Sequence, residues 1–430
     1  MNPVITLLVC FVVLVIIRVP LAFAMGLSSL VVMVQLGIPL VSVANQMFNG
    51  INSFTLLAVP FFMLLGQLLN TGGITERLLV VSNAWIGHIK GGLAHVNVLA
   101  SMLFAGLSGS STADTVGIGG MLIPAQIKAG YDKEYTVAIT ACSSVLGVII
   151  PPSVLMVFYG AMAQLSVGAL FLGGVVPGLL IGLSQMGYNV WRSNRMGYPK
   201  ADWVPWKQKF IRTGKALPAL SIPIIILGGI TAGIVTATEA AALTVFVALV
   251  LVYLVYREVP LKDLPKILGE GVVAYALAMF ALACASPLAW LIAYFDAPAA
   301  IANFMMNITS SYFGLYTLLV VFMLIIGTFL SPAMGIIIFM PIFQSVGQAA
   351  GINPIHLGIT VVICLALGQV TPPYGMCLLI ACQIGKASIP KSFMACIPIL
   401  VLALGVVFLG IAFPNLFLFL PKLLMPTAFY

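Results

Sequence analysis

The chain has 430 residues, of which 62% are hydrophobic and only 7% are charged. Soluble domains have about a quarter of their residues charged, so this composition predicts a membrane protein. The longest polar stretch, residues 192–215, is too short to bury a core of its own, which excludes a separate soluble domain. At roughly 20 residues per membrane-spanning helix, the chain holds on the order of a dozen membrane segments. The net charge of +8 is therefore not taken as evidence of nucleic-acid binding. The positions of the charged residues along the chain are used instead, to predict topology.

Lys and Arg predict which ends of the spans face the cytoplasm. Seven of the 18 fall within residues 192–215, and the positive-inside rule places that segment in the cytoplasm. No Lys or Arg precedes the first apolar run, residues 4–17, so we interpret it as an uncleaved helix. Both termini are then periplasmic, and only Lys422 among the basic residues is not cytoplasmic. The predicted spans are residues 4–17, 26–41, 55–69, 136–163, 170–190, 217–232, 240–256, 272–294 and 357–384, with a last one ending near residue 420.

Two stretches of the chain carry the same glycines, serines and prolines at a constant offset of 221 residues. Both Pro-Pro pairs lie in apolar runs, and a Pro-Pro pair cannot continue a helix. Broken backbone persists in lipid only where protein buries it or where it lines a watery cavity. Matching interruptions in two halves indicate a transporter's binding site. The matched residues are Gly106, Ser110, Gly130, Gly147, Pro151, Pro152 and Pro177, repeated as Gly327, Ser331, Gly351, Gly368, Pro372, Pro373 and Pro398.

Each broken segment follows a pair of shorter apolar runs. Residues 96–107 and 115–127 are joined by a turn whose one charge is Asp114, which favours a re-entrant hairpin entering from the cytoplasmic side. Residues 315–330 and 334–346 predict a second hairpin entering from the opposite side. The fold class is therefore an all-α polytopic membrane protein with two inverted repeats, each with a re-entrant hairpin and a broken helix. The predicted units are residues 1–190, a basic cytoplasmic linker at 191–216, and residues 217–430.

The hairpin turns and the broken helices are the candidate sites. A broken helix exposes carbonyl oxygens that suit a small hard cation and amide groups that suit a carboxylate. The alternative, that Ser and Gly only let helices pack closely, remains open at this point. Asp114 either orients the first turn and senses ligands, or only begins a helix. The first Na⁺ site would use Ser108, Ser110, Gly147, Ile150 and Ser153, and the second would use Gly327, Thr328, Ser331, Gly368 and Thr371.

Residues 108–114, 150–153, 236–239 and 371–375 resemble the large membrane subunit of tripartite ATP-independent periplasmic (TRAP) transporters, and the similarity runs through the whole chain. The resemblance implies a Na⁺-coupled importer of carboxylate solutes in the bacterial inner membrane, with at least two Na⁺ sites and an elevator mechanism. It also implies two partners, a small four-helix membrane subunit and a periplasmic solute-binding protein. The implied substrates are sialic acid, which the overall resemblance favours, and C4-dicarboxylates. Carried over by position, the substrate residues are Ser110, Ser111, Asp114, Ser153, Ser331 and Tyr374.

One position departs from the family, and three other functions compete with this one. Relatives often have an acidic residue in the second hairpin turn where this chain has Ser331. This difference weakens the assignment of a substrate to this chain by analogy with those relatives. The main alternative is a self-sufficient Na⁺/carboxylate carrier that needs no binding protein. An intramembrane serine protease is a remote one, because residues 106–109 match a GxSG pattern and His88 and His95 precede it. A channel would not need a repeated broken site.

Overall fold

The computed structural model describes residues 2–429, and within them every regular element is a helix. Seven helices are long and apolar enough to cross a membrane, or eight if the bent pair formed by α3 and the segment leading into α4 is one span. This confirms the predicted all-α polytopic membrane protein. The helices of the first half are α1 (Pro3–Ile16), α2 (Leu21–Gln35), α3 (Leu40–Ile51), α4 (Ala58–Thr71), α5 (Ile74–Ile86), α6 (Gly92–Ser108), α7 (Ser111–Lys128), α8 (Lys133–Ser144), α9 (Val154–Ala163) and α10 (Val167–Met196).

The second half repeats the order of a helical hairpin followed by a broken helix. Its hairpin is α15 (Tyr312–Phe329) with α16 (Pro332–Ala349), and its broken helix is α17 (Pro354–Gly368) with α18 (Met376–Gly385). The corresponding elements of the first half are α6 with α7, and α8 with α9. The other helices are α11 (Trp206–Thr231), α12 (Ala237–Val250), α13 (Leu264–Tyr294), α14 (Ala297–Ile308), α19 (Ile389–Ala412) and α20 (Asn415–Leu424), with short helical turns at Thr55–Leu57, Val145–Val148, Leu251–Tyr256, Leu261–Asp263 and Pro426–Phe429.

The predicted span at residues 26–41 is wrong. Helix α2 ends at Gln35, and residues 40–41 already belong to α3. Gly37 lies between them with a φ of +70°, a left-handed conformation that favours glycine, and Pro39 is the residue before α3. The apolar run therefore turns where its composition alone indicates a continuous helix. A further bend of 63° separates α3 from the segment that continues into α4.

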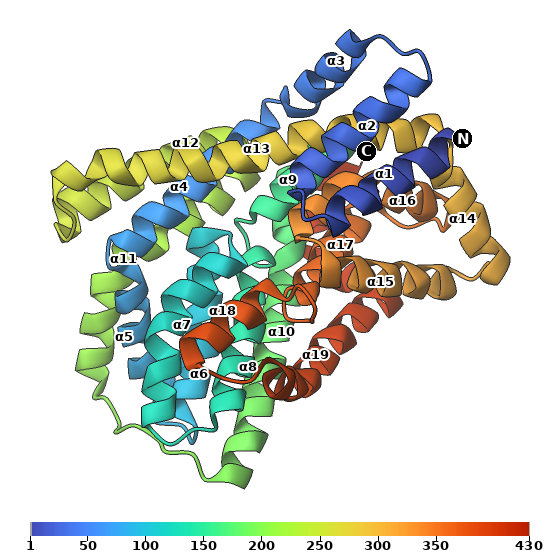
Figure 1. Cartoon of the computed structure of the whole chain (residues 1–430). Coiled ribbons are helices and arrows are strands. Elements are labelled where there is room, and N and C mark those ends of the chain that lie inside the picture. Colours follow the sequence, from blue (N-terminus) through green and yellow to red (C-terminus); the bar gives the residue numbers. More distant parts are fainter. Residues whose placement is uncertain (1, 430) are drawn as a thin grey trace.

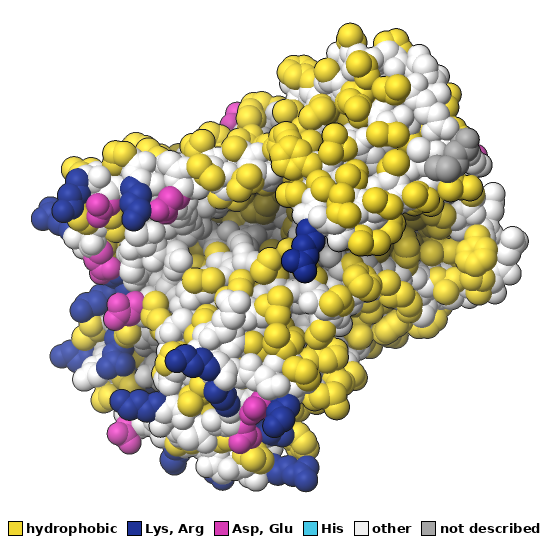
Figure 2. All heavy atoms as spheres, viewed as in Figure 1, with side chains coloured by type: hydrophobic (Ala, Val, Ile, Leu, Met, Phe, Trp, Pro, Cys, Tyr) yellow, Lys and Arg dark blue, Asp and Glu magenta, His cyan; other side chains and the backbone are white. Residues whose placement is uncertain are grey.

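The basic linker predicted at residues 191–216 is largely helical at both ends. Its non-helical part lies between Met196, the last residue of α10, and Trp206, the first of α11. This part is anchored to the first half, because the Pro199 carbonyl accepts from the Gly91 amide at 3.1 Å. Charged side chains gather along the edge formed by this linker, α5, α11 and the turn between α12 and α13, whereas the opposite end of the molecule has very few charged side chains (Figures 1 and 2).

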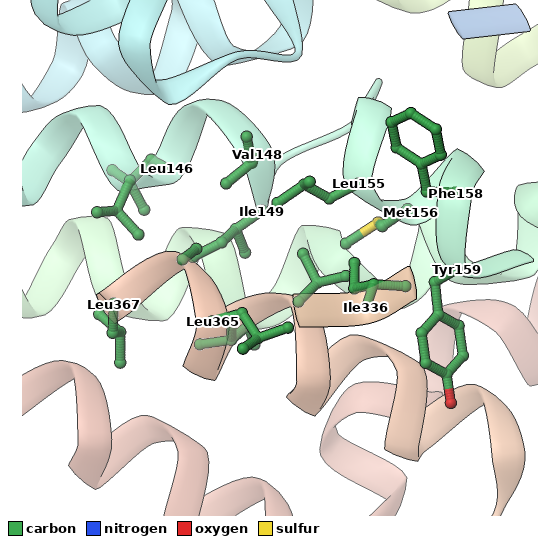
Figure 3. Close-up of a cluster of buried hydrophobic side chains, with 14 of the residues drawn as sticks. Leu146, Val148, Ile149, Leu155, Met156, Phe158, Tyr159, Ile336, Leu365 and Leu367 are labelled. Carbon is green, nitrogen blue, oxygen red and sulfur yellow. The ribbon is translucent and has the colours of Figure 1, made fainter. Parts of the chain in front are cut away.

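The two halves pack through the broken helices. Helix α18 of the second half contacts α7 and α8, and α9 of the first half contacts α16, so each hairpin lies against the other half's broken helix (Figure 1). Figure 3 shows the apolar part of this contact, in which side chains around the first break face Ile336 of α16 and Leu365 of α17. Lipid tails are as apolar as these side chains, so the contact is held by close packing rather than by exclusion of water. Both breaks therefore lie inside one helical body.

Candidate functional site

The first hairpin turns at residues 108–112, called tip 1 below. Helix α6 ends at Ser108, and Gly109 follows with a φ of +60°, the left-handed C-cap conformation that glycine adopts without strain. Ser110 then caps α7, its hydroxyl accepting from the Ala113 amide at 3.4 Å. Ser108 Oγ lies 3.4 Å from the Ser110 amide nitrogen. The two serines predicted to bind Na⁺ are thus brought together in one compact turn.

The first break lies between Val148 and α9. Pro151 and Pro152 have no N–H, so the carbonyls of Gly147 and Val148 lose the donors that a continuous helix would supply. The Ser153 hydroxyl replaces one of them by donating to the Val148 carbonyl at 2.6 Å, and it also accepts from the Met156 amide at 3.3 Å. The Val148 carbonyl thus regains a donor, whereas the Gly147 carbonyl, freed by Pro151, is not given one by Ser153. The peptide bond between the prolines is cis, as it is in the second pair.

The second break has the same origin but a different hydrogen-bond pattern. Pro372 and Pro373 remove the donors for the carbonyls of Gly368 and Gln369. The Gln369 carbonyl accepts instead from the Cys377 amide at 3.0 Å, and the Gly368 carbonyl accepts from the Thr371 amide at 3.0 Å in a tighter turn. The second break thus satisfies more of its freed backbone oxygens than the first does. It is also more open, since Thr371 and Tyr374 are partly exposed while Pro151, Pro152 and Ser153 are buried.

Glycines bring each hairpin turn into backbone contact with the break of its own half. A Cβ on Gly147 would lie 3.0 Å from the Ser110 carbonyl oxygen. In the second half the contact is closer, because a Cβ on Gly368 would lie 2.4 Å from the Gly327 carbonyl oxygen. Real Cβ atoms do not approach backbone as closely as at Gly368, so only glycine fits there, whereas at Gly147 a Cβ would be tightly packed and would push the Ser110 backbone aside by a few tenths of an ångström. The repeated glycines therefore allow each hairpin turn to pack directly against the broken helix of its own half.

The predicted Na⁺ ligands lie in two groups, one at each hairpin turn. Ser108, Ser110 and Gly147 meet at tip 1, whereas the Ile150 side chain packs toward Gly178 of α10, so only its backbone can serve a cation. Gly327 and Gly368 meet at the second hairpin turn. There the Thr328 carbonyl accepts from the Tyr374 amide at 2.9 Å, and the Thr371 hydroxyl donates to the Leu367 carbonyl at 3.3 Å. Both groups supply hydroxyl and carbonyl oxygens, the ligand type that small hard cations take.

The predicted substrate residues have more varied positions. The hydroxyl of Ser111 donates to Gln369 of the second break, so it links the two halves. Asp114 is fully buried, and one of its carboxylate oxygens accepts from Ser101 Oγ at 3.2 Å. Ser331 caps α16 by accepting from the Met334 amide at 3.5 Å. Ser110, Ser331 and Tyr374 are partly exposed, so they are the members of the set that a solute can reach.

Two features of the site were missed in the sequence. Gln369 accepts from Ser111 of the first half and from Cys377 of α18, at 3.0 Å, so it joins tip 1 to the second break. A polar network also runs behind tip 1 from Asp114 through Ser101 to α8, and its other members are Asn97, Thr140 and Ser143. The available signal was the presence of amide and hydroxyl side chains inside apolar runs, with Gln369 only three residues before a Pro-Pro pair.

The geometry does not fit a serine protease. Ser108 contacts the backbone of its own turn, and none of its hydrogen bonds within residues 2–429 involves a histidine. The ring of His88 instead packs against Trp203, with 4.4 Å between ring centroids. A nucleophilic serine needs a base within hydrogen-bond reach. The GxSG match is therefore a feature of the helix end and turn.

Comparison with known proteins decides the family. The family described as "Tripartite ATP-independent periplasmic transporter, DctM component" matches residues 8–416. The chain belongs to this family. It is 38% identical to the uncharacterized protein YgiK of Salmonella typhimurium over 99% of this chain and 98% of that protein. It is 36% identical to the sialic acid TRAP transporter large permease protein SiaM of Vibrio cholerae, with 89% of this chain and 90% of that protein covered.

A third relative, the C4-dicarboxylate TRAP transporter large permease protein DctM of Pseudomonas aeruginosa, is 37% identical, with 89% of both chains covered. Membership of the DctM family confirms the resemblance stated from the sequence motifs. The chain is a large permease subunit of a TRAP transporter and not an enzyme, so the serine protease hypothesis is wrong. As a multi-pass protein of this bacterial transporter family, it belongs to the inner membrane.

Proposed function

We propose that this TRAP permease subunit imports a small carboxylate solute by coupling its movement to Na⁺. A periplasmic binding protein delivers the solute, and a small four-helix membrane subunit completes the transporter. The observation that carries the proposal is the pairing of each hairpin turn with a break in its own half. At the first pair, the Gly147 carbonyl loses its helical donor, and the Gly147 Cα packs closely against the Ser110 backbone. Oxygens freed in this way offer a cation ligands without any carboxylate. At the second break the Gly368 carbonyl keeps a lone pair besides its bond to the Thr371 amide, so in this proposal each half supplies one Na⁺ site.

The proposed solute is sialic acid, with C4-dicarboxylates as the second candidate. SiaM and DctM relatives of similar identity carry these two substrates in their names. A carboxylate is common to both, and the start of a helix such as α7 or α16 is suited to it. Ser331 leaves the second hairpin turn neutral, so it adds no repulsion toward an anionic solute. The partly exposed Ser110, Ser331 and Tyr374 lie where the solute would be bound.

Uptake into proteoliposomes that contain the permease and its small subunit tests the proposal. With binding protein outside, we expect sialic acid uptake driven by an inward Na⁺ gradient, without ATP. Replacement of Na⁺ by K⁺ should reduce uptake to the level of empty vesicles. Uptake at the full rate in K⁺ would sink the Na⁺ coupling. Uptake at the full rate without binding protein would instead establish the self-sufficient carrier, and preference for succinate would move the solute to the C4-dicarboxylate class.

Single cysteines at Ser110 and Ser331 test the inverted repeats and the elevator movement. Both positions are partly exposed, and the native cysteines would be removed first. We expect membrane-impermeant maleimide to reach the two positions from opposite sides, because the hairpins of inverted repeats enter from opposite faces. Na⁺ and substrate should change the two labelling rates in opposite senses. Equal labelling of both positions from one face under all conditions would contradict the inverted topology.

A further inference from the structure

A cavity lies apart from the transport site, between α5, α11 and the segment that follows α12. Its volume is about 500 Å³. It opens at the edge of the molecule where the charged side chains gather (Figure 2). Three chain segments far apart in sequence form its walls, so it exists only in the folded protein. The residues that line it are Gly73, Glu76, Arg77, Val80, Arg212, Lys215 and Glu258.

One ion pair builds a wall of this cavity. The Arg77 guanidinium donates to Glu258 and, at 3.1 Å, to the Gly73 carbonyl. It also stacks on the Tyr256 ring, 4.0 Å from the centroid. Gly73 has a φ of +68°, which favours glycine, and a Cβ there would overlap the Glu258 carboxylate in its present position. Arg77 and Glu258 thus neutralise each other, and their charges are not available to a ligand.

The remaining charge of the cavity is positive. Within residues 2–429, Arg212 and Lys215 have no carboxylate within ion-pair distance, and Arg212 makes a weak bond of 3.5 Å to Gln208. Glu76 is the remaining acid of the lining. Two unpaired cations and one carboxylate leave a net charge of +1. This matches the single negative charge of a phosphodiester, which guanidinium groups bind through paired N–H donors.

The surroundings place this cavity at the membrane–water boundary. Lys209 Nζ lies 3.6 Å from the centre of the Trp203 ring, and Trp206 stacks nearby on Phe210. Tryptophans beside Lys and Arg mark the headgroup level of a bilayer. Phe210, Ile211 and Val80 are exposed next to the basic residues, and they give acyl chains an apolar surface. A ligand here would therefore meet phosphate-binding groups and an apolar face together.

We propose that this cavity binds the headgroup of an anionic membrane phospholipid. Arg212 and Lys215 hold the phosphodiester, and the acyl chains lie along the exposed apolar residues of α5 and α11. Basic pockets between helices at a membrane surface bind lipid headgroups in this manner. The bound lipid joins α5 to α11 and thereby stabilises the folded subunit.

The test compares lipids on the purified full-length protein, alone or with its small subunit. Native mass spectrometry and thermal unfolding would be measured with phosphatidylglycerol, phosphatidylcholine and soluble glycerol 3-phosphate. We expect phosphatidylglycerol to bind and to raise Tm, and the other two not to. The double variant Arg212→Gln/Lys215→Gln should bind phosphatidylglycerol about thirtyfold more weakly. The control Lys200→Gln/Lys207→Gln removes two charges of the same basic segment outside the cavity and should behave as wild type.

Equal binding of phosphatidylcholine and phosphatidylglycerol to the wild type would overturn the proposal. So would an equal loss of binding in the control, because the attraction would then be a general surface charge effect. A rise in Tm with glycerol 3-phosphate that matches the lipid would show a site for a free anion instead. If the double variant fails to fold, the wild-type lipid comparison and the single variant Lys215→Gln, an exposed residue, decide the question.

Discussion

Gly368→Ala is expected to abolish Na⁺-dependent uptake while the protein still inserts into the membrane. The added methyl would lie 2.3–2.5 Å from three backbone atoms of Gly327, and backbone cannot move aside as a flexible side chain can. Overpacking of this kind costs about 1–3 kcal/mol. The second hairpin would be displaced from its break, and the proposed Na⁺ site at Gly327 and Gly368 would be disrupted. Uptake in proteoliposomes and Na⁺ binding measured by calorimetry would record the loss.

Gly405→Ala is the matched control. Gly405 also lies inside a helix, α19, but nothing stands within 4 Å of the position of an added Cβ. Alanine favours a helix over glycine by about 1 kcal/mol, so this variant should fold and transport as wild type. Wild-type Na⁺ affinity in Gly368→Ala would show that the contact between hairpin and break does not form the cation site.

Replacing both prolines of either pair by alanine should reduce Na⁺ affinity severalfold or stop transport. At the first break, alanine at Pro151 and Pro152 restores two N–H donors, and the Gly147 carbonyl can return to the helical ladder. Each removed proline makes helix formation easier by up to ~3 kcal/mol. The same change at Pro372 and Pro373 would draw the Gly368 and Gln369 carbonyls from their bonds with the Thr371 and Cys377 amides into the helical ladder. The measurements are the Na⁺ dependence of uptake and, for insertion, the yield of monodisperse protein.

Pro177→Ala and Pro398→Ala are the controls for the paired replacements. Each of these prolines lies inside a single long helix, α10 or α19, and neither belongs to a break, although Gly178 beside Pro177 packs against Ile150. They occupy equivalent positions in the repeat, so the comparison is matched in both halves. Their replacement should spare Na⁺ affinity. Unchanged transport and Na⁺ affinity after replacement of both Pro-Pro pairs would mean that the breaks serve packing only.

Local chemistry determined the parts of this protein that could be predicted from its sequence. Composition indicated that lipid surrounds the protein. Because proline has no N–H, each Pro-Pro pair located a helix break to within a residue. The Gly and Ser residues between short apolar runs predicted both hairpins. These properties belong to a few neighbouring residues, so no distant contact could reverse them. The Na⁺ ligands, the inverted orientation and the elevator movement are predictions of the same kind, and they await the experiments above.

Contacts between distant residues were decided only by the tertiary structure. The freed Val148 carbonyl is taken by Ser153, whereas that of Gln369 is taken by Cys377, although both result from the same Pro-Pro rule. The bond from Ser111 to Gln369 joins residues 258 positions apart, and no periodicity in either segment indicates it. A proline determines which backbone oxygen loses its donor, because that effect is local. Which group replaces the donor depends on what the fold packs beside it, and that choice makes two similar breaks into two different sites.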